Sequence, residues 1–243
     1  MQTQIIQDKI LVFDIETVGE DFDAMDETTQ HVMTRWIEKE SKDEKEYAKT
    51  LENLKNEMGF SPLTGFVVAV GVLEVESQKG AVYFQAPTKK VEDFEEAGIK
   101  YKVQTEKEIL ESFWRVAEKA ASFVSFNGRS FDVPFLMIRS AALGVRPSKN
   151  LLSNRYLNLQ KFGAKHIDLM DQLTFYGAMW RRPNLHLCCR ALGIKSPKED
   201  GVDGNAVAQL FKDQKYEEIA RYNAGDLFST AGLFEKWKKY LDV

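Results

Sequence analysis

The sequence is poor in cysteine, and this shortage excludes two common ways of stabilising or equipping a protein. Its two cysteines, Cys188 and Cys189, are adjacent in a chain of 243 residues. Neighbouring cysteines cannot easily bridge each other or supply a spaced pair of zinc ligands. We therefore expect a buried, reduced pair and a cytoplasmic location.

Long apolar runs are also missing. No stretch approaches the roughly 20 apolar residues that span a membrane, so no membrane partner is expected. Residues 1–9 are polar and lack the apolar core of a signal peptide. Histidine is scarce as well. His166 and His186 have no partners at metal-ligand spacing, which favours structural roles for both.

The chain has the composition of a globular protein, with 44% hydrophobic and 12% aromatic residues. Its length and composition predict one domain over residues 1–243. The formal net charge of −4 argues against a nucleic-acid partner, but the distribution of charge argues for one. Residues 133–198 hold eleven Lys and Arg against two acids, a local charge of +9. Such a segment is a candidate footprint for a polyanion, although a solvated surface explains it equally well.

Apolar patterning predicts an α/β protein. Residues 10–13 are typical of a strand buried on both faces, and 66–75 with 80–85 are typical of an antiparallel hairpin. Between the first two strands, residues 19–65 form a charged insertion. Its apolar positions recur at helical spacing, which predicts one or two amphipathic helices. A further short strand is expected at 122–126.

Beyond this hairpin, the chain is expected to alternate between helices and strands. Thr105 and Glu108 form a capping box that opens a helix, and Pro134 suits the first turn of another. This order implies a mixed central sheet flanked by helices. The other expected segments are an irregular connection at 86–104, helices at 105–121, 131–143, 185–192 and 205–212, a basic loop at 145–165, an edge strand at 167–169 followed by a helix to 180, a turn at 200–204, and one or two closing helices at 216–240.

Two carboxylates stand at the end of the first expected strand. Asp14 and Glu16 are two residues apart, so in an extended strand they share a face. Two acids on one face repel each other, and removing them from water is expensive. A divalent cation bound between them removes both penalties. An acidic loop explains the pair without any function, so partners elsewhere in the chain decide between these interpretations.

Further acids stand at the ends of later elements. Asp132 follows the strand at 122–126 and a turn that begins at Asn127. In the closing helix, Tyr222 and Asp226 are four residues apart and therefore lie on one helix face. Four carboxylates supply the oxygen ligands that a pair of hard divalent cations needs, with positions left for water and phosphate. A tyrosine hydroxyl nearby supplies a hydrogen bond that can orient an attacking water.

These motifs carry a family resemblance in four segments: Phe13–Thr17 (FDIET), Ser125–Phe135 (SFNGRSFDVPF), His166–Leu169 (HIDL) and Arg221–Asp226 (RYNAGD). Their order resembles the DEDD superfamily of 3′–5′ exonucleases, in its tyrosine-bearing (DEDDy) branch, whose domains have an RNase H-like fold. The chain is similar to the proofreading exonuclease domains of family B DNA polymerases and to stand-alone exonucleases predicted to resemble them. The resemblance spans nearly the whole chain and includes no polymerase domain.

The resemblance implies roles for individual residues. It implies two divalent cations, Mg²⁺ or Mn²⁺, and gives Tyr222 the task of orienting the attacking water. The implied metal ligands are Asp14, Glu16, Asp132 and Asp226. Thr17, Asn127 and Phe131 would lie near the terminal nucleotide.

A pair of arginines stands apart from these motifs. Arg181 and Arg182 follow Trp180, and together they are candidates to hold a nucleic-acid backbone and stack a base. A solvated helix end explains the same three residues equally well.

We therefore expect a metal-dependent 3′–5′ exonuclease that releases nucleoside 5′-monophosphates from single-stranded 3′ ends. The family B similarity alone favours DNA over RNA, so a 3′–5′ exoribonuclease is an open alternative. A non-catalytic nucleic-acid-binding module of the same fold predicts the loss of at least one acid, and none is lost. A metal-binding acidic protein without a nucleic-acid partner is disfavoured by the basic segment 133–198.

Overall fold

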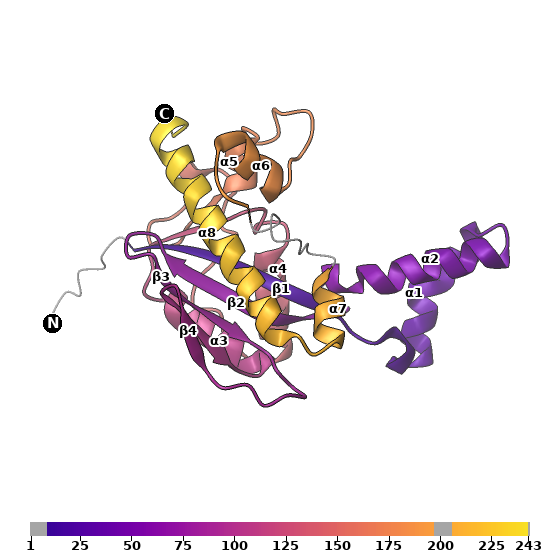
Figure 1. Ribbon diagram of the computed structural model, residues 1–243. Helices are drawn as coiled ribbons and strands as arrows, with labels where there is room; N and C mark the ends of the chain where they lie inside the picture. The colour runs from indigo at the N-terminus through magenta and orange to yellow at the C-terminus, as the bar shows by residue number, and fades with distance from the viewer. Residues whose placement is uncertain (1–8, 197–205, 243) are drawn as a thin grey trace.

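The computed structural model describes residues 9–196 and 206–242, and at its centre lies a seven-stranded sheet (Figure 1). The strands are β1 (Ile10–Gly19), β2 (Gly65–Glu74), β3 (Lys79–Phe84), β4 (Phe94–Glu96), β5 (Ile99–Val103), β6 (Ser122–Ser125) and β7 (Lys165–Asp168). Their order is β4-β5-β3-β2-β1-β6-β7. β1 is antiparallel to β2 and parallel to β6, so the sheet is mixed, as predicted.

Helices cover both faces of the sheet. The helices of the described residues are α1 (Glu27–Glu40), α2 (Glu44–Glu57), α3 (Glu106–Ala117), α4 (Asp132–Ala142), α5 (Leu169–Leu173), α6 (Leu185–Leu192), α7 (Ala206–Lys212) and α8 (Tyr216–Tyr240), with 3₁₀ turns η1 (Phe22–Ala24), η2 (Met58–Phe60) and η3 (Leu157–Leu159). α8 crosses one face over β1 and β2, and α3 and α4 lie on the other face (Figure 1). Among the described residues, every helix is too short or too polar to cross a membrane.

β1 is buried on both faces, as its apolar sequence predicts. Val12 and Phe13 are fully buried and, because strand side chains alternate, they enter different cores. Val12 shares its cluster with Leu227 of α8. Phe13 packs against Phe113 of α3, with ring centroids 5.6 Å apart. The central strand therefore holds the two helical layers together.

β1 is longer than the expected strand, and this changes the setting of its acids. Asp14 and Glu16 lie inside the strand rather than at its end, because β2 continues to pair with β1 as far as Gly19. β6, in contrast, pairs only with residues 10–12. One edge of β1 is therefore left open beside Asp14, and the acids lie just beyond the end of the parallel neighbour.

The expectation of an irregular connection at 86–104 was wrong. β4 and β5 form there, and β5 pairs in parallel with β3. Ile99 and Tyr101 are buried while Lys100 between them is exposed, the two-residue alternation of a half-buried strand. Phe94 stacks on Tyr101 at 4.3 Å between ring centroids, so a contact across strands completes the edge.

Several other boundaries differ from expectation. The helix expected to reach residue 180 ends at Leu173, because Phe175 and Tyr176 have φ values of 52° and 56° and the chain leaves the helix there. The helix expected to reach 121 ends at Ala117. The antiparallel hairpin of β2 and β3, the capping box at Thr105, the edge strand β7 and the helix α6 are confirmed. The turn expected at 200–204 lies outside the described residues.

The charged insertion forms two helices, which confirms that prediction. α1 and α2 pack against each other and project away from the sheet (Figure 1). Their N-termini are capped by the side chains of Asp26 and Asp43. The turn η2 returns the chain to the sheet, where the Thr17 hydroxyl donates a hydrogen bond of 2.6 Å to the carbonyl of Gly59. The insertion is thus tied to β1 next to Glu16.

α8 is one continuous helix of 25 residues that comes very close to β2 at Gly71. A Cβ atom at Gly71 would lie 2.1 Å from Oδ1 of Asn223 and 2.7 Å from a methyl group of Leu227. Gly71 pairs with Asp14 across the two strands. Because Gly71 has no side chain, α8 can lie close to the face of β1 that carries Asp14.

Gly71→Ala is expected to destabilise the fold by about 1–3 kcal/mol, the usual cost of overpacking a core. Asn223→Ala removes the nearest clashing atom, so the double variant should be more stable than the sum of the single effects implies. Urea denaturation of the parent, both single variants and the double variant measures this coupling. Strictly additive effects would show that α8 and β2 do not meet as described.

Candidate metal centre and active site

Three carboxylates meet between β1 and α8. Asp14 and Glu16 project from one face of β1, and Asp226 comes from α8. One oxygen atom from each lies within 4.8 Å of the others. Glu16 and Asp226 are buried, and Asp14 is half-buried. A strand spacing of two and a helix packed across it thus produce a compact acidic cluster from distant parts of the chain.

Asp132 lies beside this cluster but outside the group of three within 4.8 Å. It is the first residue of α4 and is 4% exposed. Its carboxylate accepts a hydrogen bond from the backbone N–H of Ile15, at the edge of β1 that β6 leaves open. The charge of Asp132 raises the pKa of Asp14, so the two side chains share one electrostatic site.

Burial dominates the electrostatics of the cluster. Loss of water raises the pKa of Asp14 and of Glu16 well above their usual ranges, and the charge of Asp226 raises both further. Burial also raises the pKa of Asp132 to about 8. Among the charges that act on Asp14 and Glu16 within the described residues, none is positive. The acids are therefore poorly compensated by the protein itself.

Asn223 is the residue of this site that the sequence motifs did not identify. It is fully buried on α8, and its Nδ2 donates to Asp14 at 2.8 Å and to Glu16 at 3.5 Å. These bonds lower the pKa of both acids and so oppose the effect of burial. Within residues 9–196 and 206–242, its Oδ1 has no hydrogen-bond partner, and it faces Gly71. The available signal was its position three residues before Asp226, which places both on one helix face.

Tyr222 faces a pocket that the acids share. This pocket has a volume of about 460 Å³ and is lined by Asp14, Asp226, Asn127 and Arg182, among others. Burial raises the pKa of Tyr222 above its usual range, and the nearby carboxylates act in the same direction. The phenol therefore stays protonated and can donate a hydrogen bond. Asp226 is one of its hydrogen-bond partners.

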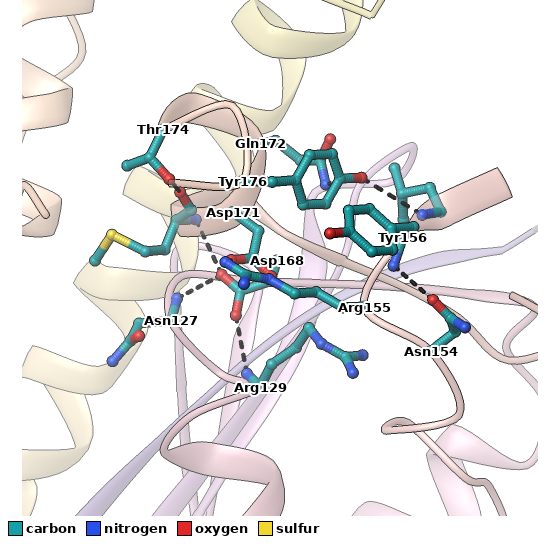
Figure 2. Close-up of polar contacts among 12 residues, drawn as sticks. Asn127, Arg129, Asn154, Arg155, Tyr156, Asp168, Asp171, Gln172, Thr174 and Tyr176 are labelled. Atoms are coloured by element: carbon teal, nitrogen blue, oxygen red, sulfur yellow. Dashed lines mark hydrogen bonds and ion pairs between the residues drawn. The ribbon is translucent and has the colours of Figure 1, made fainter. Parts of the chain in front are cut away.

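A buried aspartate fixes the turn that carries Asp132. Asp168 accepts hydrogen bonds from the backbone N–H groups of Asn127, Arg129 and Met170 at 2.8–2.9 Å, as Figure 2 shows. Asp171 forms an ion pair with Arg155. Asp168 thus caps α5 and Asp171 forms an ion pair, and neither belongs to the cluster of Asp14, Glu16 and Asp226. The turn at 127–131 is consequently held against the end of β7.

The residues expected near the terminal nucleotide divide into two groups. Asn127 and Arg182 line the pocket, and Asn127 has a left-handed φ of 64°. The Thr17 hydroxyl, however, donates its hydrogen bond to the carbonyl of Gly59. Phe131 packs against Phe135, with ring centroids 5.1 Å apart. Arg181 is exposed. The structure thus places two of these side chains at the pocket and gives the other three different surroundings.

The histidines have the structural contacts that their spacing favours. His166 is buried between Ser125 and the carbonyl of Leu151, at 2.7 and 3.0 Å, and burial lowers its pKa to about 4. His186 forms a hydrogen bond of 2.9 Å with Ser196. Cys188 and Cys189 are buried and reduced, as expected.

The donor set of the cluster fits a hard divalent cation. Every group that Asp14, Glu16 and Asp226 offer is a carboxylate oxygen, the ligand type that Mg²⁺ and Mn²⁺ prefer. A bound cation would also place positive charge beside Asp14 and Glu16, whose pKa values no cationic group among the described residues lowers. Asp132 stands close enough to influence Asp14 and extends the same acidic surface.

The fold resembles that of a polymerase of known structure. The family B DNA polymerase from the hyperthermophilic archaeon Pyrobaculum calidifontis matches with a TM-score of 0.59 at 18% sequence identity. The match covers 95% of this chain and 24% of the polymerase, so the chain spans about a quarter of that protein. The mixed α/β architecture, with its flanked seven-stranded sheet, is consistent with the RNase H-like fold of the PolB exonuclease domain and confirms the expected fold class.

A fold of this class, with an acidic cluster on its central strand, is typical of metal-dependent nucleases. Residues 67–242 match the family described as "Predicted 3'-5' exonuclease related to the exonuclease domain of PolB". The chain belongs to this exonuclease family, and its substrate class is therefore nucleic acid. The matched range includes Asp132, Tyr222 and Asp226, while Asp14 and Glu16 precede it. No curated protein matches the chain.

The raised pKa of Asp132 predicts how stability depends on pH. The carboxyl titrates at about 8 in the folded protein and at about 4 in an unfolded chain, so between these values folding binds a proton. The contribution of Asp132 to stability therefore falls as the pH rises from about 4 to about 8. Asp132→Asn should raise the unfolding temperature in chelator, by more at pH 8 than at pH 5.

Thermal unfolding in EDTA at both pH values measures this difference, with the exposed Asp213→Asn as the matched control. Each unit of pKa difference corresponds to about 1.4 kcal/mol. Mg²⁺ or Mn²⁺ added at pH 8 should stabilise the parent more than Asp132→Asn. An identical gain at pH 5 and pH 8 would contradict the burial of an ionised group at this position.

Proposed function

We propose that the chain is a two-metal 3′–5′ exonuclease of the tyrosine-bearing (DEDDy) branch of the DEDD superfamily. The observation that carries this proposal is the meeting of Asp14, Glu16 and Asp226 within 4.8 Å, with Tyr222 at the same pocket. Strand spacing placed the first two acids together, and helix spacing placed the tyrosine beside the third. Four acids and the tyrosine are all present, which disfavours a non-catalytic module of the same fold.

Each residue of the site has a proposed task in phosphodiester hydrolysis. Asp14, Glu16 and Asp226, with Asp132 beside them, would hold two divalent cations, Mg²⁺ or Mn²⁺. Bound cations of this kind supply an activated water and stabilise the leaving 3′ oxygen. The protonated phenol of Tyr222 donates a hydrogen bond that orients the attacking water. The products are nucleoside 5′-monophosphates.

The proposed substrate is a single-stranded 3′ end. The acids lie at a pocket of about 460 Å³, and a paired terminal nucleotide must leave its duplex to enter it. Unpairing a nucleotide costs a few kcal/mol, and a frayed or single-stranded end avoids most of that cost. The likeness to a family B DNA polymerase supports DNA, and exoribonuclease activity on RNA is the second candidate.

Two further features complete the proposal. Residues 1–243 act as one exonuclease domain, in which the segment between β1 and β2, residues 19–65, is an insertion. Cys188 and Cys189 are buried and reduced rather than joined in a disulfide, which supports a reducing, cytoplasmic location.

Asp14→Ala should abolish hydrolysis, because a buried ligand is lost, while the fold is retained because like-charge repulsion falls. Tyr222→Phe should slow the chemical step about 10²–10⁴-fold and leave Mn²⁺ and DNA binding near the parent values. The assay follows labelled single-stranded DNA and RNA with Mg²⁺, with Mn²⁺ and with chelator.

Matched controls for these variants are Asp242→Ala and Tyr240→Phe, both at exposed positions near the C-terminal end of the chain. If purified Asp14→Ala hydrolysed DNA at the parental rate, Asp14 would not belong to the active site. A parental rate for Tyr222→Phe would reduce this tyrosine to a packing residue. Equal rates on blunt duplex and single-stranded ends would contradict the proposed substrate.

The arginines predict the salt dependence of binding. Arg182 lines the pocket and Arg181 is exposed beside it, so both are placed to contact phosphates without reading sequence. Each phosphate contact adds about 0.7 to the salt slope for a single strand. The double variant Arg181→Glu/Arg182→Glu should therefore weaken binding equally for all sequences and flatten the slope.

The control for this variant makes the same charge change on α1, with Arg35→Glu/Lys39→Glu. Binding of labelled (dT)₁₂ across a series of salt concentrations gives both slopes. An unchanged slope in the Arg181/Arg182 variant would show that these arginines do not contact the phosphates of the bound strand. Lys198, at the end of the basic segment, lies outside the described residues.

A further inference from the structure

We propose that the loop between α5 and α6, residues 174–184, is a stacking surface for the bases that precede the terminal nucleotide of a single strand. This inference rests on the proposed function and adds a binding surface to it. We call these residues the Trp180 loop.

The Trp180 loop exposes an unusual amount of apolar surface. Trp180 is 95% exposed, Phe175 is 58% exposed and Met179 is 47% exposed. Trp114 and Trp237, in contrast, are almost completely buried. Isolated exposed apolar residues are common on protein surfaces, but three within six residues form a patch that calls for a partner.

The backbone of the loop is firmly held. Phe175, Tyr176 and Gly177 have successive left-handed φ values of 52°, 56° and 96°. This conformation is costly for the two residues with side chains, so it persists only where surrounding contacts enforce it. Hydrogen bonds from the N–H of Tyr176 to the carbonyl of Asp171, at 2.7 Å, and from Met179 to Thr174, at 3.2 Å, provide part of that enforcement.

The two adjacent aromatic side chains of this turn, Phe175 and Tyr176, have different surroundings. Tyr176 turns inward, where its ring lies against Tyr156 at 4.9 Å between centroids and its hydroxyl accepts a hydrogen bond from Gln172 (Figure 2). Phe175, its neighbour, is turned out to solvent. Backbone hydrogen bonds hold residues 174–179, so this part of the loop loses little conformational entropy when it binds a flat partner.

The charge around the loop selects the class of partner. The sequence from 172 to 190 contains Arg181, Arg182 and Arg190 and no acid. Arg182 and Pro183 line the pocket that also contains Asp14, Tyr222 and Asp226. The pocket is therefore lined in part by residues two or three positions from Trp180, which puts the Trp180 loop within reach of a strand whose 3′ end occupies the pocket. Exposed aromatic rings next to arginines match the bases and phosphates of a single strand.

The test compares substrates that reach the loop with one that does not. The p-nitrophenyl ester of thymidine 5′-monophosphate presents one nucleotide only, while (dT)₂, (dT)₄ and (dT)₁₂ extend progressively beyond the pocket. The variants are Trp180→Ala and Trp180→Phe, with Trp36→Ala on α1 as a matched control that is also partly exposed, at 43%.

Trp180→Ala should raise KM for (dT)₁₂ roughly 5- to 150-fold, the range expected for one lost stacking contact. The rise should grow with strand length and be smallest for the ester. Trp180→Phe should keep most of the affinity because a ring is still present. Trp36→Ala should match the parent on every substrate.

A parental KM of Trp180→Ala on (dT)₁₂ would overturn the inference. The same would follow from an equal rise on all substrates, which indicates damage to the pocket. If the parent hydrolyses neither the ester nor any oligonucleotide, the proposed function fails separately. Equilibrium binding of labelled (dT)₁₂ to the parent and to Trp180→Ala then decides the inference, with a tighter parent in support and equal affinities against.

Discussion

Repulsion among buried carboxylates is the constraint on which the rest of this structure depends. Asp14, Glu16 and Asp226 each place one oxygen atom within 4.8 Å of the others, and loss of water makes the charges of Asp14 and Glu16 unfavourable. The fold keeps them there by covalent and packing constraints: a central strand that carries two of them and a helix of 25 residues that carries the third. Asn223 offsets part of the repulsion with its amide. Carboxylates that repel one another in this way oppose folding, and the same negative charge would attract a cation to the proposed metal centre.

The parts of the site that could be predicted from the sequence are those set by local geometry. A spacing of two along a strand fixes Asp14 relative to Glu16, and a spacing of four along a helix fixes Tyr222 relative to Asp226. The hairpin of β2 and β3 and the capping box at Thr105 are also local patterns, and both form as predicted. The order of the motifs along the chain then indicated the fold class, because it matched a known arrangement of strands and helices.

The parts that could not be predicted depend on contacts between distant residues. Nothing near Asn223 in the sequence reveals that Gly71, 152 positions earlier, leaves room for its side chain. The Thr17 hydroxyl is taken by Gly59 only because the insertion returns to the sheet at that point. β4 was missed because three residues are too few to show alternation, and it is completed by the stacking of Phe94 on Tyr101. The early end of α5 follows from left-handed residues that carry no glycine signal until Gly177.

The close approach of α8 to β2 at Gly71 also limits which substitutions this protein can accept during evolution. A side chain larger than hydrogen at position 71 meets the amide of residue 223, while a smaller residue at 223 withdraws a donor from Asp14. Neither position can change first without harm, one because of space and the other because of charge. Gly71 and Asn223 are therefore expected to occur together in related sequences. A protein that replaces one of them should also need changes in the acidic cluster. The close packing at Gly71 thus restricts which substitutions the acidic cluster can accept during evolution.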